Sequence, residues 1–190
     1  MKNKGLLIVY TGASGVGKGT IMKELLRKNP NLRLSVSATT RAPREGEVDG
    51  REYYFVSREK FDRMIAENGF LEHAEYVGNK YGTPKAPVFS MLDEGLDVFL
   101  EIEVKGFLQI KKAYPECVSI FICPPSFEEL RLRLEGRGTE SPEVIEERLR
   151  TAESEIGYKD MFDYIVVNDD ADRAAREVMS IISDIKDKEK

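Results

Sequence analysis

The sequence predicts an α/β fold in which a parallel sheet of five strands carries helices on both faces. Apolar segments of strand length recur along the chain and alternate with helical patterns, which is typical of such a sheet. A glycine-rich loop joins the first of these segments to the first helical pattern, as in sheets that bind nucleotides. The five predicted strands are residues 5–10, 32–37, 97–104, 117–123 and 164–168.

Helix signals lie between these strands. After the glycine-rich loop, apolar residues recur at helical spacing until Pro30 ends the pattern. Ser126 opens a helix with a capping box, and Ser141 opens another with proline in its first position. The last helix begins after Asp170 or Asp172, either of which could cap it, and its apolar residues form one stripe.

The glycine-rich loop has the composition of a phosphate-binding loop. Glycines let the backbone fold so that successive N–H groups point at phosphate oxygens, and the positive end of the following helix adds to this attraction. The spacing fits the motif G-x-x-x-x-G-K, whose lysine supplies an ammonium group for the outer phosphates of a nucleotide. The loop therefore predicts a P-loop NTPase-type core. Its triphosphate site comprises Gly12, Ala13, Ser14, Gly15, Val16, Gly17, Lys18, Gly19 and Thr20.

One position departs from that motif. The Ser or Thr expected directly after Lys18 is Gly19, and the hydroxyl comes one residue later, on Thr20. This shift weakens direct side-chain coordination of Mg²⁺ but leaves the phosphate contacts intact. A dinucleotide-binding fingerprint fits less well, because Thr20 stands where its third glycine or alanine would be. A glycine-rich turn that binds nothing is the other alternative.

Length and composition narrow the class of protein. With 190 residues, 41% of them hydrophobic and 33% charged, the chain can form one globular unit with a substantial core. Its net charge of −5 argues against a general nucleic-acid-binding protein. No apolar segment approaches membrane-spanning length, and the early first strand leaves no room for a signal peptide. We therefore expect a cytoplasmic protein without membrane or nucleic-acid partners.

Cysteine and histidine usage predicts neither a disulfide nor a histidine-based site. Cys117 and Cys123 bracket one predicted strand, so they lie about 20 Å apart, too far for a disulfide. They are expected to be buried thiols, as in cytosolic proteins. His73 is the only histidine and is expected to have a structural role.

Residues 40–96 interrupt the alternation of strands and helices. Turn residues come first, followed by a short strand near 53–56, a helix near 57–68 and an alternating segment over 70–77 that ends at a turn. We interpret these residues as a small α+β insertion in a single domain whose core is residues 1–39, 97–125 and 158–190.

Residues 126–157 are two capped helices joined by a loop that holds a glycine-flanked arginine, which suits a lid over phosphates. An ordinary surface hairpin is the alternative. Phosphoryl transfer depends on positioning and on neutralising charge, so cations must gather around both sets of phosphates. Two arginines follow the carboxyl end of the second strand, which faces the ligand crevice in a parallel sheet. The candidate cations are Arg41, Arg44, Arg133, Arg137 and Arg148.

Three carboxylates are candidates for polar roles beside these cations. Glu101 and Glu103 end an apolar strand on the same strand face, and burying them is costly unless something pairs with them. Glu101 suits a Mg²⁺ shell through water. Glu103 or Glu72 suits the amino group of a base. Guanine presents adjacent N1–H and N2 donors that complement a carboxylate, whereas adenine does not, so acids in the pocket favour guanine.

The chain resembles the guanylate kinase family from about residue 5 to residue 185. The segment Ser35–Gly50 carries the resemblance more specifically than the phosphate loop does. Further motifs of the family lie at Tyr53, Phe70–Glu72, Tyr81–Thr83, Glu101–Glu103, Leu134–Glu140 and Val166–Asp170. Glu103 is one methylene longer than the aspartate common there, and Lys105 stands where glutamine is frequent.

This resemblance implies a role for each matching residue. The insertion would bind GMP through Ser37, Arg41, Arg44, Tyr53, Glu72, Tyr81, Thr83 and Glu103. The residues of the phosphate loop would bind ATP together with Arg133, Arg137 and Asn168. The residues expected in catalysis are Lys18, Arg44, Arg137 and Arg148. Thr20 and Glu101 are the candidate Mg²⁺ ligands, directly or through water.

The activity that follows is transfer of the ATP γ-phosphoryl group to GMP, with Mg²⁺ bridging phosphates of ATP, to give ADP and GDP. A non-catalytic guanylate-kinase-like binding module would be expected to lack Lys18 or the lid arginine, and both are present. A P-loop kinase for another small phosphorylated acceptor would not require Glu72 and Tyr81 beside the arginines. A nucleic-acid-binding ATPase is disfavoured by the acidic balance. Use of dGMP and the oligomeric state stay open.

Overall fold

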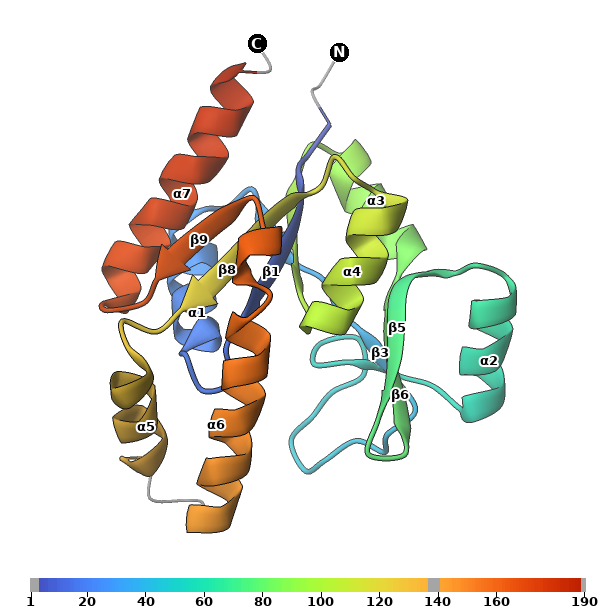
Figure 1. The fold of residues 1–190 in the computed structure, drawn as a ribbon. Coiled ribbons are helices and arrows are strands. Elements are labelled where there is room, and N and C mark those ends of the chain that lie inside the picture. The colour runs from blue at the N-terminus through green and yellow to red at the C-terminus, as the bar shows by residue number, and fades with distance from the viewer. Residues whose placement is uncertain (1–3, 137–140, 189–190) are drawn as a thin grey trace. The chain divides into compact units, whose positions relative to one another are not determined.

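A computed structural model describes residues 4–136 and 141–188 (Figure 1). Five strands form one sheet in the order β2-β7-β1-β8-β9, in which β2 runs parallel to β7 and β8 parallel to β9. They are the five predicted core strands, so the predicted α/β class with a five-stranded parallel sheet is confirmed. Their bounds are β1 (Leu7–Gly12), β2 (Leu32–Leu34), β7 (Asp97–Glu101), β8 (Val118–Cys123) and β9 (Tyr164–Val167).

The residue contacts divide the chain into two compact units. The first unit comprises Met1–Val9 and Asn31–Val118, and the second comprises Tyr10–Pro30 and Ser119–Lys190. The division into core, insertion and lid remains a prediction.

The first unit contains a second, four-stranded sheet in the order β4-β3-β6-β5. Strands β5 and β6 form an antiparallel hairpin, and α2 packs its buried Phe61 against Phe70 of β5 with ring centroids 4.4 Å apart. The helix near 57–68 and the turn after the alternating segment are confirmed. The further elements of this unit are β3 (Ala38–Thr39), β4 (Tyr54–Phe55), α2 (Arg58–Ala66), β5 (Phe70–Tyr76), β6 (Asn79–Pro84), α3 (Lys85–Asp93) and α4 (Val104–Ala113).

In the second unit, α1 packs against α7, and α5 packs against α6 (Figure 1). The caps predicted from sequence are confirmed, since the Ser126 hydroxyl accepts from the Glu129 N–H at 3.0 Å and the Asp170 carboxylate accepts from the Arg173 N–H at 2.8 Å. Asp170 rather than Asp172 therefore caps the last helix. The helices of this unit are α1 (Lys18–Lys28), α5 (Phe127–Glu135), α6 (Pro142–Ile156), the 3₁₀ turn η1 (Lys159–Met161) and α7 (Ala171–Lys188).

Strand β7 is shorter than its sequence pattern predicts. It ends at Glu101, and Glu103 is the N-cap of α4, with an extended backbone but no side-chain hydrogen bond. The prediction that both acids lie on one strand face is therefore wrong. The ladder with the edge strand β2 ends at Phe99, whereas β1 flanks β7 on its other side, and β7 ends two residues later at Glu101.

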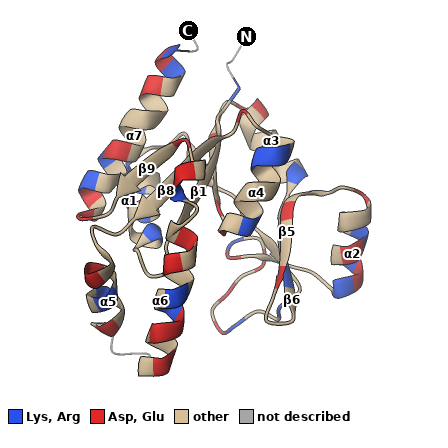
Figure 2. Cartoon of the chain, in the orientation of Figure 1, with Lys and Arg blue, Asp and Glu red and all other residues tan. Residues whose placement is uncertain are grey.

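Charged side chains of both signs are interleaved along α6 and α7 (Figure 2). Ion pairs one turn apart, such as Arg173 with Glu177 at 2.8 Å, bridge exposed parts of α7. Among the described residues, none of the helices is both long enough and apolar enough to cross a membrane.

Candidate active site

The phosphate loop runs from the end of β1 into α1. Gly15 and Gly17 have φ angles of 83° and 94°, which a residue with a side chain adopts only under strain. Gly17 is the N-cap of α1, and in the described chain no side chain caps this helix. The Thr20 N–H donates to the Gly17 carbonyl at 3.1 Å, and among the described residues no side-chain cap competes with an anion for the N-terminal end of the helix.

Lys18 lies against its own loop. Its ammonium group donates to the carbonyl oxygens of Gly12 at 2.6 Å and Ala13 at 3.2 Å. These contacts keep the positive charge at the loop. The ammonium is carried on a flexible stem, so it can turn from the carbonyl groups toward a phosphate.

Helix α6 contacts the phosphate loop through two charged side chains. The Ser14 N–H donates to the Glu155 carboxylate at 2.8 Å, and the Arg148 guanidinium donates to the Ser14 hydroxyl at 3.3 Å. The sequence predicts Arg148 as a site residue, and the structure brings it to the loop. Glu155 was missed, although it follows Arg148 by two helical turns and hence lies on the same face of α6.

Asn168 contacts the phosphate loop, and Arg133 contacts Asn168. Arg133 donates to the Asn168 carbonyl at 2.9 Å and to the Glu129 carboxylate at 3.0 Å. The buried Asn168 amide donates to the Val16 carbonyl at 2.7 Å. Of the two predicted residues, Asn168 thus contacts the loop backbone, and Arg133 contacts Asn168. The predicted Arg137 lies outside the described residues.

A second group of predicted residues gathers on the four-stranded sheet of the first unit. In the β5–β6 hairpin, Glu72 is paired with Thr83 and Ala74 with Tyr81, and Tyr81 is also paired with Thr39 of β3. Directly paired residues of a sheet share one face, so these side chains lie on the same side. Ser37 precedes β3, and its carbonyl accepts from the Tyr54 N–H of β4 at 2.9 Å.

Glu72 is a buried carboxylate. Its side chain accepts from the Thr83 hydroxyl at 2.6 Å, and only 7% of the residue is exposed. Burial raises the pKa of Glu72, the hydrogen bonds from Thr83 lower that pKa, and the nearby Glu103 carboxylate raises it further. In the part of the chain that the structure describes, no cation forms an ion pair with Glu72. A ligand with paired N–H donors would satisfy it.

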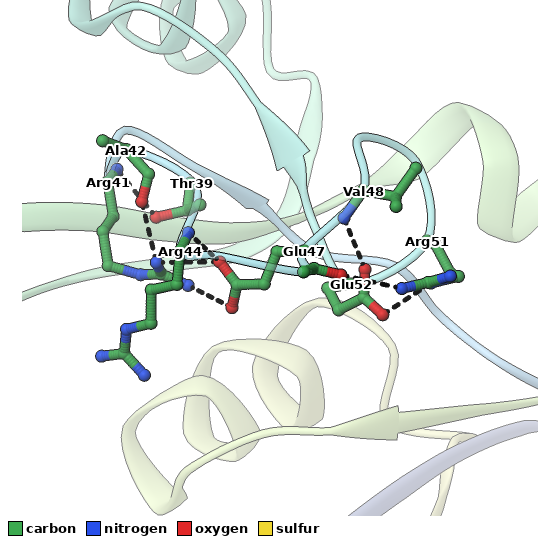
Figure 3. Close-up of polar contacts among 9 residues, drawn as sticks. Thr39, Arg41, Ala42, Arg44, Glu47, Val48, Arg51 and Glu52 are labelled. Carbon is green, nitrogen blue, oxygen red and sulfur yellow. Dashed lines mark hydrogen bonds and ion pairs between the residues drawn. The ribbon is translucent and has the colours of Figure 1, made fainter.

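The loop between β3 and β4 holds Arg41 in a fixed position (Figure 3). The two terminal nitrogens of Arg41 donate to the two Glu47 oxygens at 3.0 and 2.9 Å, and Glu47 also accepts from the Arg44 N–H at 2.7 Å. The hydrogen bond from Arg41 is the main reason that the pKa of Glu47 is lowered. Arg44 is exposed, and its guanidinium makes no hydrogen bond or ion pair within the described residues, so it can take an anion.

Two tyrosines lie beside Arg41. Its guanidinium carbon is 5.4 Å from the ring centroid of Tyr53, and that ring is 6.0 Å from the ring of Tyr81. Partial burial raises the pKa of Tyr53, so its hydroxyl stays protonated and can donate. Arg41, Arg44, Tyr53 and Tyr81 are thus brought together as the resemblance implies.

The candidate metal ligands are oxygen donors on exposed residues. Thr20 lies in the first turn of α1 in the second unit, and Glu101 ends β7 in the first unit. Residues 4–136 and 141–188 contain no cluster of three or more His, Cys, Asp or Glu side chains that could hold a metal ion. Hydroxyl and carboxylate oxygens are nevertheless the hard donors that Mg²⁺ takes, directly or through water.

The cysteines agree with the expectation of buried thiols, and the structural role expected of His73 stays a prediction. Cys117 and Cys123 are buried, and neither is in a disulfide. His73 is exposed, and its backbone N–H and carbonyl bond the side-chain amide of Gln109 at 3.2 and 2.9 Å, which joins β5 to α4.

Comparison with protein families gives one family for most of the chain. The family model described as guanylate kinase matches residues 4–185. A guanylate kinase of Caldanaerobacter subterraneus subsp. tengcongensis is 53% identical over 182 residues, which cover 96% of this chain and 88% of the relative. A guanylate kinase of Clostridium tetani is 54% identical over 180 residues, covering 95% and 86%.

A solved structure gives the same result. The crystal structure of guanylate kinase from Anaplasma phagocytophilum matches with a TM-score of 0.75 and 37% sequence identity. The match covers 96% of this chain and 86% of that chain.

Proposed function

The chain belongs to the guanylate kinase family and is an ATP:GMP phosphotransferase, and we propose that its two units divide the substrates between them. The second unit, with the phosphate loop, binds ATP. The first unit, with the four-stranded sheet and the loop after β3, binds GMP. This proposal is supported by the position of each group of residues within one unit.

On the donor side, the loop N–H groups and Lys18 bind the phosphates of ATP. Lys18 is the group that neutralises the charge developing on the transferred phosphoryl group, because its ammonium already lies at the loop. Arg148 adds a second charge from α6, and Arg133 and Asn168 keep the loop backbone in shape. Arg137 is proposed to join them from the lid.

On the acceptor side, the arginines bind the phosphate and the buried acid binds the base. Arg41, Tyr53 and Tyr81 are held together, and Arg44 supplies a guanidinium with no other partner in the described chain. Glu72 accepts from guanine N1–H and N2, with contributions from Ser37, Thr83 and Glu103. The buried, cation-free carboxylate of Glu72 is the observation that carries the choice of guanine, since a carboxylate buried without a cation needs hydrogen-bond donors.

The chemical step needs no nucleophile from the protein. A phosphate oxygen of GMP attacks the γ-phosphorus of ATP, the bond from that phosphorus to the β–γ bridging oxygen breaks, and ADP leaves as GDP forms. Family members generally use Mg²⁺ with ATP, and the ion would neutralise charge on the β- and γ-phosphates. We propose Thr20 of the second unit as one candidate ligand and Glu101 of the first unit, acting through water, as another.

We further propose that residues 40–96 form a GMP-binding region and residues 126–157 a lid on the core, within one domain. The two buried cysteines, neither of them in a disulfide, suit a cytoplasmic location. The net charge of −5 favours small-molecule partners over nucleic acid.

A coupled assay of ADP release, with GMP, dGMP, AMP, CMP and UMP as acceptors, tests this proposal. We expect GMP to give the highest kcat/KM. AMP, CMP and UMP, whose bases lack the N1–H and N2 donor pair, should give little turnover. Comparable rates with AMP would contradict the assignment of Glu72. Nucleotide binding without turnover would instead favour a binding module.

A further inference from the structure

Gly106 lies where helix α4 meets the Glu72 carboxylate. It is the third residue of α4 and is buried. A Cβ atom built on Gly106 would lie 2.8 Å from Oε2 of Glu72 and 3.2 Å from its Cδ. Real carbon–oxygen contacts are longer than the first distance, so the room for the carboxylate exists because residue 106 has no side chain.

The backbone conformation does not explain this glycine. Gly106 is absent from the glycines with positive φ, so its place in the helix is open to alanine as far as the backbone is concerned. Within a helix, glycine is less favourable than alanine. Helix α4 is ten residues long and has no side-chain N-cap. A glycine at position 106 therefore does not stabilise this helix.

The Glu72 carboxylate is held from two sides. Thr83 of β6 donates to its Oε1 at 2.6 Å, and the backbone of α4 at Gly106 borders its Oε2. The carboxylate is the far end of a flexible side chain, whereas α4 packs along β5. A methyl group at position 106 would therefore displace the carboxylate before it displaced the helix.

We propose that Gly106 is a positioning residue for base recognition, whose missing side chain allows the Glu72 carboxylate to lie between Thr83 and α4 in the orientation that accepts from guanine. This inference rests on the proposed function of Glu72. Gly106 itself need not touch the nucleotide. It sets the position of Glu72, the residue proposed to touch it.

The test is the variant Gly106→Ala, measured for GMP and ATP binding by calorimetry, for KM and kcat, and for thermal unfolding. We expect GMP affinity to fall about tenfold, ATP affinity to stay unchanged, and Tm to stay equal or rise because of the helix propensity of alanine. Leu108→Ala, on a more exposed part of α4, is the control and should leave GMP affinity unchanged.

A second variant links the effect to Glu72. Glu72→Asp shortens the side chain by one methylene and withdraws the carboxylate from position 106, so adding Gly106→Ala to Glu72→Asp should change GMP affinity less than adding it to the wild type. Equal losses in both backgrounds would overturn the inference, as would unchanged GMP affinity of Gly106→Ala or an equal loss of GMP and ATP affinity. The outcome is distinct from failure of the proposed function, which would show as unchanged GMP affinity of Glu72→Gln.

Discussion

At the scale of single residues, the two substrates are distinguished by the kinds of groups that meet them. In the function that we propose, Lys18 and the arginines provide charge for phosphates; without a nucleotide, Lys18 and Arg41 are paired with protein oxygens. Glu72 is the opposite case, because its carboxylate is buried with hydrogen bonds from Thr83 alone among the described residues. The free energy that this burial costs is recovered only when a ligand supplies further donors.

Glu72→Gln should therefore weaken GMP binding by roughly 1.5–3 kcal/mol, because an amide replaces a charged acceptor. Calorimetric titration with GMP measures the loss. Glu75→Gln, an exposed position on the same strand, is the matched control and should bind GMP normally. Unchanged affinity of a folded Glu72→Gln protein would count against the base pocket.

The pKa of Glu72, which burial raises above its usual value of 4.5, predicts a pH dependence of GMP binding. Protonation removes the acceptor, so wild-type affinity should fall as pH decreases toward this raised pKa. The GMP phosphate also takes up a proton at about pH 6, and this affects GMP binding by both proteins. The ratio of wild-type affinity to Glu72→Gln affinity should therefore be followed over about pH 5 to 8. We expect that ratio to approach one on the acid side. A ratio independent of pH would show that Glu72 does not bind as a carboxylate.

The same pKa predicts the effect on stability. Because the folded pKa is raised, the folded state binds a proton more readily than the unfolded chain, and Glu72 favours folding below its unfolded pKa. That advantage is lost as pH rises through the folded pKa. At neutral pH we therefore expect Glu72→Gln to unfold at higher denaturant concentration than the wild type, with a smaller difference in acid. A less stable variant at neutral pH would mean that the hydrogen bonds from Thr83 stabilise the charged carboxylate by more than burial destabilises it.

At the scale of elements, helix α6 contacts the phosphate loop, and we expect this contact to affect ATP binding. Glu155 and Arg148 contact the N–H and the hydroxyl of the same residue, Ser14. Two side chains of one helix thus hold the third residue of the loop. The shape of the loop decides whether its N–H groups converge on phosphates, so this contact belongs to the donor site although Glu155 itself is negative.

Glu155→Gln keeps the size of the side chain but removes its charge, so the hydrogen bond from the Ser14 N–H should weaken. We expect ATP binding to weaken by about 1–2 kcal/mol, which corresponds to a rise in KM for ATP of about five- to thirtyfold. KM for GMP should stay unchanged. Glu153→Gln, exposed on the same helix, is the control. A rise in KM for GMP alone would contradict a role at the phosphate loop.

The elements also show how far sequence reasoning extends. Strands such as β8, buried along its length, and helices with clear caps are predicted because local pattern and burial agree. Helix α3 has no comparable signal: it is nine residues long, carries proline in its first turn, and buries only Val88 and Leu92. Strand β7 ends at Glu101, two residues beyond its ladder with β2, and no local pattern in its sequence marks that end.

For the site, the sequence predicts residues that belong to a motif and misses those defined by contact. Lys18, Arg41 and Glu72 follow from motif and chemistry. Glu155 and Gly106 do not, because one is an acid on a helix rich in acids and the other a single glycine. Their importance depends on the atom that lies beside each in the folded chain.

At the scale of the whole molecule, a protein with a net charge of −5 binds two anions. The attraction must therefore be local, and it is supplied by a few cations set among many charges of both signs (Figure 2). In the function that we propose, those for ATP belong to one compact unit and those for GMP to the other. Each unit can thus be changed without altering the residues that bind the other nucleotide.

This separation predicts a crossed result for Lys18→Ala and Arg44→Ala. Lys18→Ala should weaken ATP binding and lower turnover at saturation by at least about a hundredfold, because a charge contact to the transition state is lost, while GMP binding is preserved. Arg44→Ala should weaken GMP binding and spare ATP binding, because its guanidinium is reserved for the acceptor phosphate.

Both dissociation constants are measured for both proteins by calorimetry, with single-turnover rates at saturating substrate. Thermal unfolding provides an independent readout, since a ligand at 100 times its Kd stabilises the folded state by about 2.7 kcal/mol. The shift in Tm caused by ATP should be smaller in Lys18→Ala, and the shift caused by GMP should be smaller in Arg44→Ala. If either variant lost both shifts equally, the two nucleotides would depend on shared residues, and the assignment of one substrate to each unit would be wrong.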